Sequence, residues 1–136
     1  MAKLYLLLFL AATLECSFGA ICPNPSSYSG QSLCDPWGTY CGECVSFYKV
    51  CSGDTRTTSS WGQGQRVKGA NLQFGTGIAT FTNGKYDSGH TAIYVGQSAT
   101  GIDVWDQWVG QPVHQRTLRF DSTSYQNDGD NFYVIV

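Results

Sequence analysis

The sequence predicts an α+β domain in which one N-terminal helix packs on an antiparallel β-sheet. Two observations support this fold class. The segment CVSFYKVC, residues 44–51, has apolar residues on most of its sides, as a short buried helix requires. Downstream of it, apolar residues recur with the period of two that is typical of strands. A helix followed by a run of strands favours an α+β arrangement over alternating βαβ units.

Residues 1–19 are predicted to be a secretory signal peptide. Lys3 precedes the apolar run LYLLLFLAA, which is short for a membrane span, and the small residues of SFG predict cleavage after Gly19. A membrane anchor is the alternative, but Glu15 interrupts the run and no cationic stop follows it. We therefore expect a secreted, extracellular product with no membrane segment after cleavage, made of one domain over residues 20–136.

The segments around the helix are predicted to be loops. Residues 20–40 form an irregular N-terminal loop that contains the turn signal DPWG. Gly53, just past the helix, suits a C-terminal cap. Residues 54–77 are polar and glycine-rich, and we expect a long loop there with Trp61 as its apolar anchor.

Five segments with period two are predicted strands, joined into a meander with turns at NGK (83–85) and ATG (99–101). They are 78–81, 91–95, 102–108, 113–120 and 131–136.

The charge balance argues against nucleic acid as a partner. The chain has 8 Lys+Arg against 10 Asp+Glu, a net charge of −2, whereas phosphate binding requires a basic face. We expect a monomer.

The cysteine count predicts one free thiol. If Cys16 of the six cysteines leaves with the signal peptide, an odd number remains, and an odd count in a secreted protein indicates a free thiol or an intermolecular bridge. The five that remain are Cys22, Cys34, Cys41, Cys44 and Cys51.

Helix geometry limits the possible pairings. Seven helical residues at about 1.5 Å each place Cys51 about 10 Å from Cys44, beyond the usual Cα separation of bonded cysteines, and Cys41 lies further still. With Cys44 free, two arrangements stay open. One joins Cys22 to Cys51 and Cys34 to Cys41, and the other joins Cys22 to Cys41 and Cys34 to Cys51. We favour the first because DPWG folds residue 34 back towards residue 41.

Cys44 has the surroundings of a nucleophile. A thiol in the first turn of a helix lies beside unpaired N–H groups and the positive end of the dipole, which lower its pKa. Nucleophilic catalysis also needs a histidine within hydrogen-bond reach. His90 opens a strand directly after a glycine, where the helix N-terminus could meet it, whereas His114 is one residue of a strand face. We therefore predict His90 as the base.

Asp106 is the predicted orienting group. It lies far enough along strand 102–108 to approach the start of the preceding strand, where His90 is. Asp103 is too near the turn, and Gln107 points to the opposite face unless a bulge changes its direction.

The same residues carry a resemblance to a known family. CGEC is similar to the stretch around the papain nucleophile, and GHTAIYVG resembles the CHAP and NlpC-type papain-fold amidases. A closer resemblance is to the family-two amidase effectors of bacterial type VI secretion and their domesticated relatives secreted by arthropods such as ticks. It extends over roughly residues 40–136 and runs through GECVSFYK, SSWGQGQRVKG, GTGIATFTNGKYDSGHTAIYVG and GIDVWDQWVGQPVHQRTLRF.

The resemblance implies a papain-like peptidoglycan amidase with Cys44 as nucleophile and His90 as general base. It implies cleavage of stem-peptide crosslinks in the bacterial wall, at the diaminopimelate–D-alanine amide, and we expect a role in antibacterial defence. The signal peptide and the additional N-terminal cysteines depart from the bacterial pattern. From the mechanism we expect the backbone N–H of Cys44 to stabilise the oxyanion, with Tyr40 as a candidate second donor. We expect neither a cofactor nor a metal.

Two other classes of function are alternatives to an amidase. A thiol–disulfide oxidoreductase would use Cys41 and Cys44, but its CxxC motif should follow a strand of a βαβ unit. A secreted wall-binding module without activity would merely carry a leftover thiol. A zinc site at Cys41, Cys44 and the histidines is disfavoured because no second close ligand pair is present.

Overall fold

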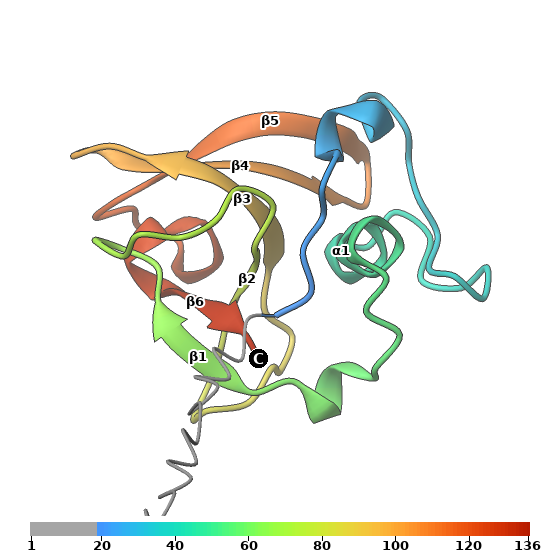
Figure 1. Ribbon diagram of the computed structural model, residues 1–136, viewed down its shortest axis with the longest axis horizontal. Helices are drawn as coiled ribbons and strands as arrows, with labels where there is room; N and C mark the ends of the chain where they lie inside the picture. Colours follow the sequence, from blue (N-terminus) through green and yellow to red (C-terminus); the bar gives the residue numbers. More distant parts are fainter. Residues whose placement is uncertain (1–18) are drawn as a thin grey trace, which may run out of the picture.

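A computed structural model describes residues 19–136, which form one α-helix and one six-stranded antiparallel sheet (Figure 1). The predicted signal peptide lies outside the described residues, apart from Gly19. The predicted α+β class with a helix packed on an antiparallel sheet is confirmed.

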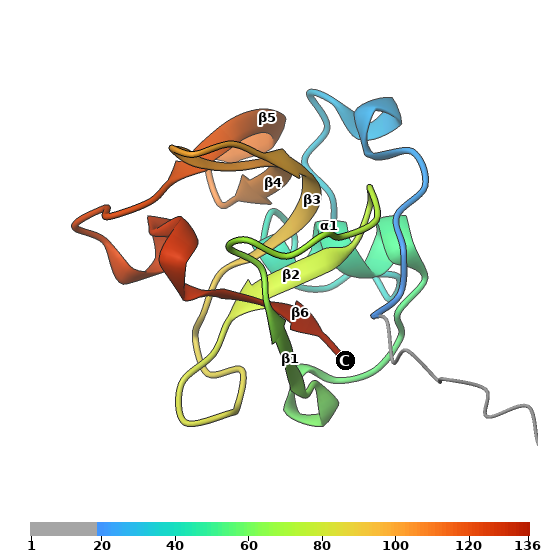
Figure 2. The same cartoon turned by 60° about the vertical axis from the view of Figure 1, so that its left-hand side comes forward.

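The sheet has the strand order β1-β6-β2-β3-β4-β5. Its strands are β1 (Gln63–Arg66), β2 (Gly77–Thr80), β3 (Thr91–Gln97), β4 (Gly101–Trp108), β5 (Gln111–Arg119) and β6 (Phe132–Ile135). Strands β2 to β5 form the predicted meander, each pairing with the next. The last strand does not continue it, because β6 crosses back to lie between β1 and β2 (Figure 2).

Strand β1 was not predicted from the sequence. Its residues QGQR lie in the segment expected to be a polar loop, and they are mostly exposed. An edge strand with both faces near solvent has no apolar alternation that could reveal it. Its partner β6 is buried, since it is covered by strands on both sides.

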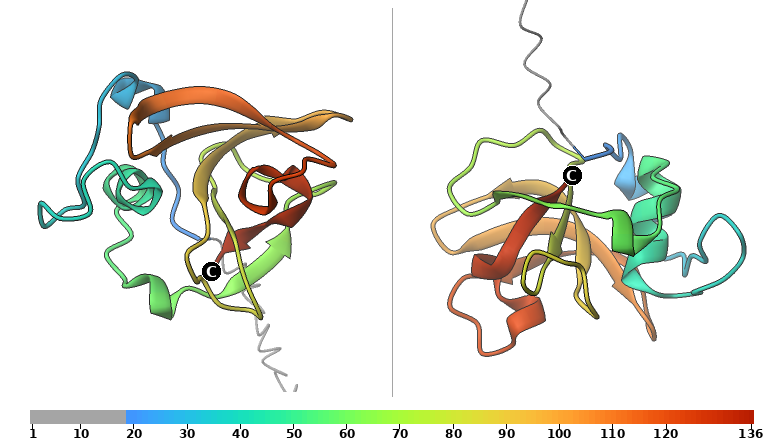
Figure 3. Two further views of the ribbon diagram at one scale, coloured as in Figure 1. Left: turned by 180° about the vertical axis from the view of Figure 1, so that it is seen from behind. Right: turned by 90° about the horizontal axis from the view of Figure 1, so that it is seen from below.

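Helix α1 spans Cys44–Ser52 and ends as predicted at Gly53, whose φ of 74° is left-handed. The Gly53 N–H donates to the Lys49 carbonyl at 2.9 Å. The helix contacts β3 and β4, and the segment before it, residues 20–43, wraps around it (Figure 3). Short 3-10 helices lie at Pro25–Tyr28, Thr58–Ser60, Tyr125–Asn127 and Gly129–Asn131.

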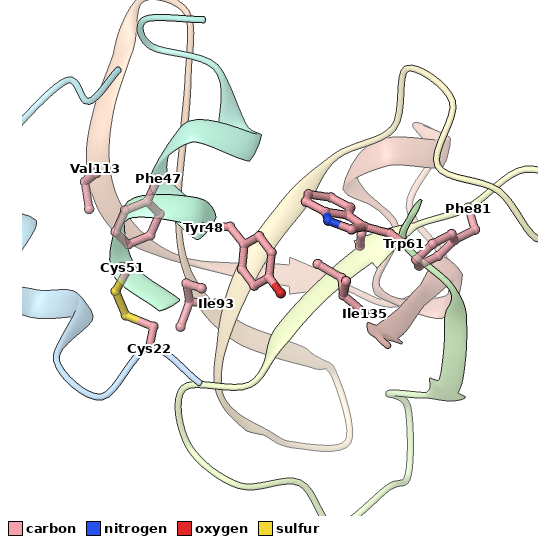
Figure 4. Close-up of a cluster of buried hydrophobic side chains, with 10 residues drawn as sticks. Cys22, Phe47, Tyr48, Cys51, Trp61, Phe81, Ile93, Val113 and Ile135 are labelled. Carbon is pink, nitrogen blue, oxygen red and sulfur yellow. A yellow bond between two sulfur atoms is a disulfide. The ribbon is translucent and has the colours of Figure 1, made fainter. Parts of the chain in front are cut away.

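Tyr48 lies at the centre of the core that joins α1 to the sheet (Figure 4). It is fully buried, its ring meets Trp61 edge-on at 5.1 Å, and its hydroxyl donates to Asp54 at 2.8 Å. Trp61 is 3 % exposed and is therefore the apolar anchor that was expected for its loop. A second buried cluster covers the opposite face of the sheet and includes Ile78, Val104 and Phe132. With both faces packed, the sheet is a firm base for the helix N-terminus.

Two disulfides tie the N-terminal segment down. Cys22 is bonded to Cys51, and Cys34 is bonded to Cys41. This is the first of the two arrangements that the sequence left open. Among the described residues, Cys44 is the free cysteine. Because Cys41 is bonded to Cys34, it cannot form a redox pair with Cys44.

Candidate active site

Cys44 is the first residue of α1 and lies at the wall of a cavity of about 580 Å3. Its side chain is largely buried, with the residue 8 % exposed. Its Sγ lies 3.6 Å from the hydroxyl of Tyr86, which lines the same cavity. As the first helical residue, it has a backbone N–H without an acceptor inside the helix. A nucleophile and an unpaired donor therefore meet at one edge of the cavity.

His90 comes directly before β3 and is held at both its backbone groups by Thr80. Its N–H donates to Thr80 Oγ1 at 2.9 Å, and its carbonyl accepts the Thr80 N–H at 3.0 Å. The imidazole Nε2 lies 2.7 Å from Asp106 Oδ2. Since Nε2 is engaged there, Nδ1 is the ring nitrogen left to face Cys44.

Asp106 is fully buried on β4, on the same side of the sheet as His90. The pairing of Ile93 with Trp105 sets this register, because it brings the second half of β4 beside the start of β3. Asp103 instead lies near the turn and accepts a hydrogen bond from Thr117. The structure thus brings Cys44, His90 and Asp106 together and leaves Asp103 away from them.

Two residues of β5 join this group without having been predicted in it. Arg116 Nε donates to Asp106 Oδ2 at 2.8 Å, and its terminal nitrogen lies 3.2 Å from His90 Nε2. His114 Nε2 lies 3.0 Å from Asp106 Oδ1, an ion-pair distance, although the angles do not make it a hydrogen bond. The β4–β5 register pairs Asp106 with His114 and Val104 with Arg116. The register of the β4–β5 hairpin is thus the signal that would have placed both residues beside Asp106.

The electrostatics favour a thiolate paired with an imidazolium. Burial raises the pKa of the Cys44 thiol, but the hydrogen bond and charge of His90 outweigh it, and the pKa falls below its ordinary 9.0. Burial lowers the pKa of His90, yet the bonds to Asp106 and Cys44 raise it to about 9. The pKa of Asp106 is lowered, since its bonds to His90 and Arg116 overcome the effect of burial. The carboxylate is therefore charged and available to stabilise the imidazolium.

Trp108 covers this charged group. Its ring lies edge-on to His90 with centroids 6.3 Å apart, and edge-on to His114 at 5.1 Å. The Arg116 guanidinium lies over the same ring at 4.7 Å. An apolar cover of this kind keeps water from Asp106 and strengthens its interactions with the cations around it.

Gln107 lies on the face of β4 opposite to Asp106, as predicted, and its side chain supports the N-terminus of helix α1. It is fully buried, and it exchanges two hydrogen bonds of 2.9 Å with the backbone of Leu33. Its amide also donates to the Glu43 carbonyl at 2.8 Å. Glu43 is the residue before Cys44, so Gln107 fixes the position from which the thiol projects. This positioning role was not predicted.

Tyr40 lies at the rim of the cavity with its side chain 69 % exposed. Its φ of 49° is left-handed, and its carbonyl accepts from Ser46 Oγ at 2.6 Å. The residue therefore shapes the turn into α1 with its backbone, while most of its surface is exposed.

Within residues 19–136, no cluster of three or more metal-ligating side chains is found. No helix in that part of the chain is long and apolar enough to cross a membrane.

Comparison with known proteins shows which family this chain resembles over most of its length. The chain matches the family described as "Domesticated amidase effector 2" over residues 9–135. It is 40 % identical to "Domesticated amidase effector 2" of Ixodes scapularis over 121 residues, covering 84 % of this chain and 82 % of the relative. It is also 35 % identical to the "Type VI secretion amidase effector 2 protein" of Salmonella typhi over 96 residues, which cover 57 % of this chain and 72 % of that protein.

A solved structure of "Type 6 secretion amidase effector 2 (Tae2)" superposes with a TM-score of 0.67 at 28 % identity. The match covers 85 % of this chain and 92 % of that one. The family match over residues 9–135 includes helix α1 with Cys44, His90 directly before β3, and β4 with Asp106. This chain therefore belongs to the domesticated amidase effector 2 family.

Proposed function

We propose that this protein is a secreted peptidoglycan amidase that cleaves the diaminopimelate–D-alanine crosslink between stem peptides through a cysteine acyl-enzyme. The observation that carries the proposal is the buried chain of contacts from Cys44 through His90 to Asp106 at the wall of an open cavity. A thiol, a histidine and a carboxylate in that order are the parts that cysteine amidases need. Membership of an amidase effector family agrees with this chemistry.

In the first half-reaction, the Cys44 thiolate attacks the carbonyl carbon of the D-alanine residue. The negative charge that develops on the carbonyl oxygen is stabilised by the backbone N–H of Cys44 and by one further donor. The His90 imidazolium then gives its proton to the departing amine of diaminopimelate, and the C–N bond breaks. A thioester on Cys44 and a free stem peptide result.

In the second half-reaction, neutral His90 accepts a proton from water as the water oxygen attacks the thioester carbon. The C–S bond breaks, the D-alanine carboxylic acid leaves, and Cys44 and His90 return to the charged pair. Asp106 stays ionised throughout and stabilises the imidazolium in both halves, while Arg116 holds the carboxylate in place.

Tyr40 remains our candidate for the further oxyanion donor, because it lines the cavity beside Cys44. The Tyr86 hydroxyl is the alternative, since it lies 3.6 Å from Sγ. That hydroxyl already donates to the Gly89 carbonyl at 3.0 Å, so it would have to exchange partners during the reaction.

The cellular setting belongs to the same proposal. The predicted signal peptide over residues 1–19, the two disulfides and the proposed cell-wall substrate favour an extracellular protein that acts in antibacterial defence, and we expect it to be a monomer. The net charge of −2 does not suit a nucleic-acid partner. A wall-binding module without activity would not need the Cys44–His90 charge pair, which is why we favour the enzyme.

Digestion of purified diaminopimelate-type sacculi tests the proposal. We expect mass spectrometry of the released fragments to show crosslinked dimers converted to monomers with new D-alanine carboxyl ends and new diaminopimelate amines. Cys44→Ala should abolish this conversion while circular dichroism and the melting temperature stay near those of the parent protein. Dimers left intact by the parent protein, or conversion by Cys44→Ala at the parent rate, would contradict the proposal.

A further inference from the structure

Lys49 is a buried cation that lines the same cavity as Cys44. It lies on α1 and is 8 % exposed, yet within residues 19–136 it has no carboxylate within ion-pair distance. Its Nζ lies over the ring of Trp37, 5.7 Å from the ring centroid. Burying an ammonium group without an anion costs free energy that other parts of the fold must offset.

Neither neighbouring acid forms an ion pair with Lys49. The pKa of Asp35 is lowered mainly by the hydrogen bond from the Thr39 side chain and in part by the charge of Lys49, so the two charges interact, but the Asp35 oxygens are hydrogen-bonded to other groups. Its Oδ1 accepts the N–H groups of Trp37 and Thr39 at 3.0 and 2.8 Å, and its Oδ2 accepts the Thr39 hydroxyl at 2.7 Å. Glu43 also lines the cavity, but it is exposed and forms no ion pair with Lys49. Lys49 therefore lines the cavity without a carboxylate of residues 19–136 in ion-pair contact.

The position of Lys49 near the C-terminal end of α1 does not explain why its side chain is buried. A cation there interacts favourably with the helix dipole, but that interaction is obtained equally well by an exposed side chain. Helical side chains lean towards the helix N-terminus, so Lys49 extends over the turn that contains Val45, another residue of the cavity wall. The Lys49 side chain therefore leaves the helix on the side that faces the Cys44 end, and its Nζ lies over the Trp37 ring.

We propose that Lys49 binds a diaminopimelate carboxylate of the crosslinked stem peptides, and so selects substrates in which that carboxylate is free. This inference rests on the proposed function. Each crosslinked dimer has a diaminopimelate residue on either side of the scissile amide. The five-residue step from Cys44 to Lys49 corresponds to about 7.5 Å along the helix axis. One or two extended residues at about 3.5 Å each span that distance, so a diaminopimelate carboxylate reaches Lys49 while the amide carbonyl faces Cys44.

Two defined crosslinked dimers test the proposal. They are identical except that the side-chain carboxylates of diaminopimelate are free in one and amidated in the other. We expect kcat/KM of the parent enzyme to be about tenfold or more higher for the free acid, since a charge-assisted hydrogen bond to the carboxylate is lost in the amide. This comparison needs no variant and so does not depend on how a substitution affects folding.

Variants then assign the preference to Lys49. Lys49→Met keeps the length of the side chain without its charge. It should lower kcat/KM for the free acid more than kcat/KM for the amide, so that the ratio of the two values comes close to one. Lys49→Arg should keep the preference. Lys85→Met is the matched control, because Lys85 is exposed on the β2–β3 connection and lies outside the cavity lining.

A ratio near one in the parent enzyme would overturn the inference, and so would a ratio that Lys49→Met leaves intact in a folded protein. Either result would leave the proposed function standing, because both dimers would still be cleaved. Failure of the parent enzyme to cleave either dimer would instead overturn the proposed function, and the carboxylate subsite with it.

Discussion

Replacing Asp106 by Asn should take the positive charge from His90 and the negative charge from Cys44. Asp106 is the group whose hydrogen bond raises the His90 pKa most, and the pKa stands at about 9 instead of 6.5. One pKa unit corresponds to about 1.4 kcal/mol, so this rise favours the imidazolium by about 3 kcal/mol. In the variant, burial and the Arg116 guanidinium 3.2 Å away both disfavour a second cation, and we expect the His90 pKa to fall below about 7.

The effect on the thiol can be worked out in the same way. Without a charged His90 the Cys44 pKa returns towards its ordinary 9.0, and a thiol with that pKa is about 3 % thiolate at pH 7.5. We therefore expect kcat/KM and the rate of Cys44 alkylation by iodoacetamide to fall by up to about 30-fold at pH 7.5. In the parent enzyme, activity should rise with pH as Cys44 ionises and fall as His90 loses its proton near pH 9. In the variant, the fall should move to lower pH.

The control for this experiment removes the partner charge. Asn at 106 leaves the partly buried Arg116 beside His90 without its carboxylate, and breaking such a pair costs up to about 3–5 kcal/mol of stability. The double variant Asp106→Asn with Arg116→Gln should regain part of that stability without regaining alkylation rate. The reasoning would be refuted by a folded Asp106→Asn variant whose activity still falls only near pH 9 and whose Cys44 is alkylated within about threefold of the parent rate.

Two further predictions concern side chains outside the catalytic group. Gln107→Leu leaves buried backbone groups of Leu33 and Glu43 without partners, so we expect about 2–3 kcal/mol lower stability in urea denaturation and lower kcat with little change in KM. An unchanged kcat in the folded variant would show that Gln107 does not position Cys44. Tyr48→Phe removes one hydrogen bond to Asp54, which keeps its bonds to Arg56, and should cost about 1 kcal/mol, or about 4 °C in melting temperature, with activity unchanged. A large loss of activity would instead link this core to the site.

Residues that depend on local order could be predicted from the sequence. Cys44 was found from its place at the start of a helix and from the odd cysteine count, and the distance along that helix ruled out its pairing with Cys51. His90 was predicted from its place after a glycine at the start of a strand, and Asp106 was predicted because neighbouring strands of a meander run antiparallel. Each of these inferences requires knowing only the position of one helix or of two neighbouring strands.

Residues that depend on several elements at once were missed. Arg116 and His114 reach Asp106 only through the register of a second hairpin, β4 with β5. Gln107 donates to Glu43, which is 64 residues away in the sequence, and no local sequence pattern predicts that contact. The polar strand β1 could not be seen either, because its place at the sheet edge depends on where β6 returns.

The most direct test of the account is to follow activity while Cys44 is alkylated. Iodoacetamide at pH 7 should modify Cys44 alone among the cysteines, because the other four of residues 19–136 are bonded. We predict that crosslink cleavage falls in proportion to the fraction of Cys44 labelled, as measured by peptide mass spectrometry, and reaches zero at one label per chain. Full cleavage activity in completely labelled protein would contradict the claim that Cys44 is the nucleophile.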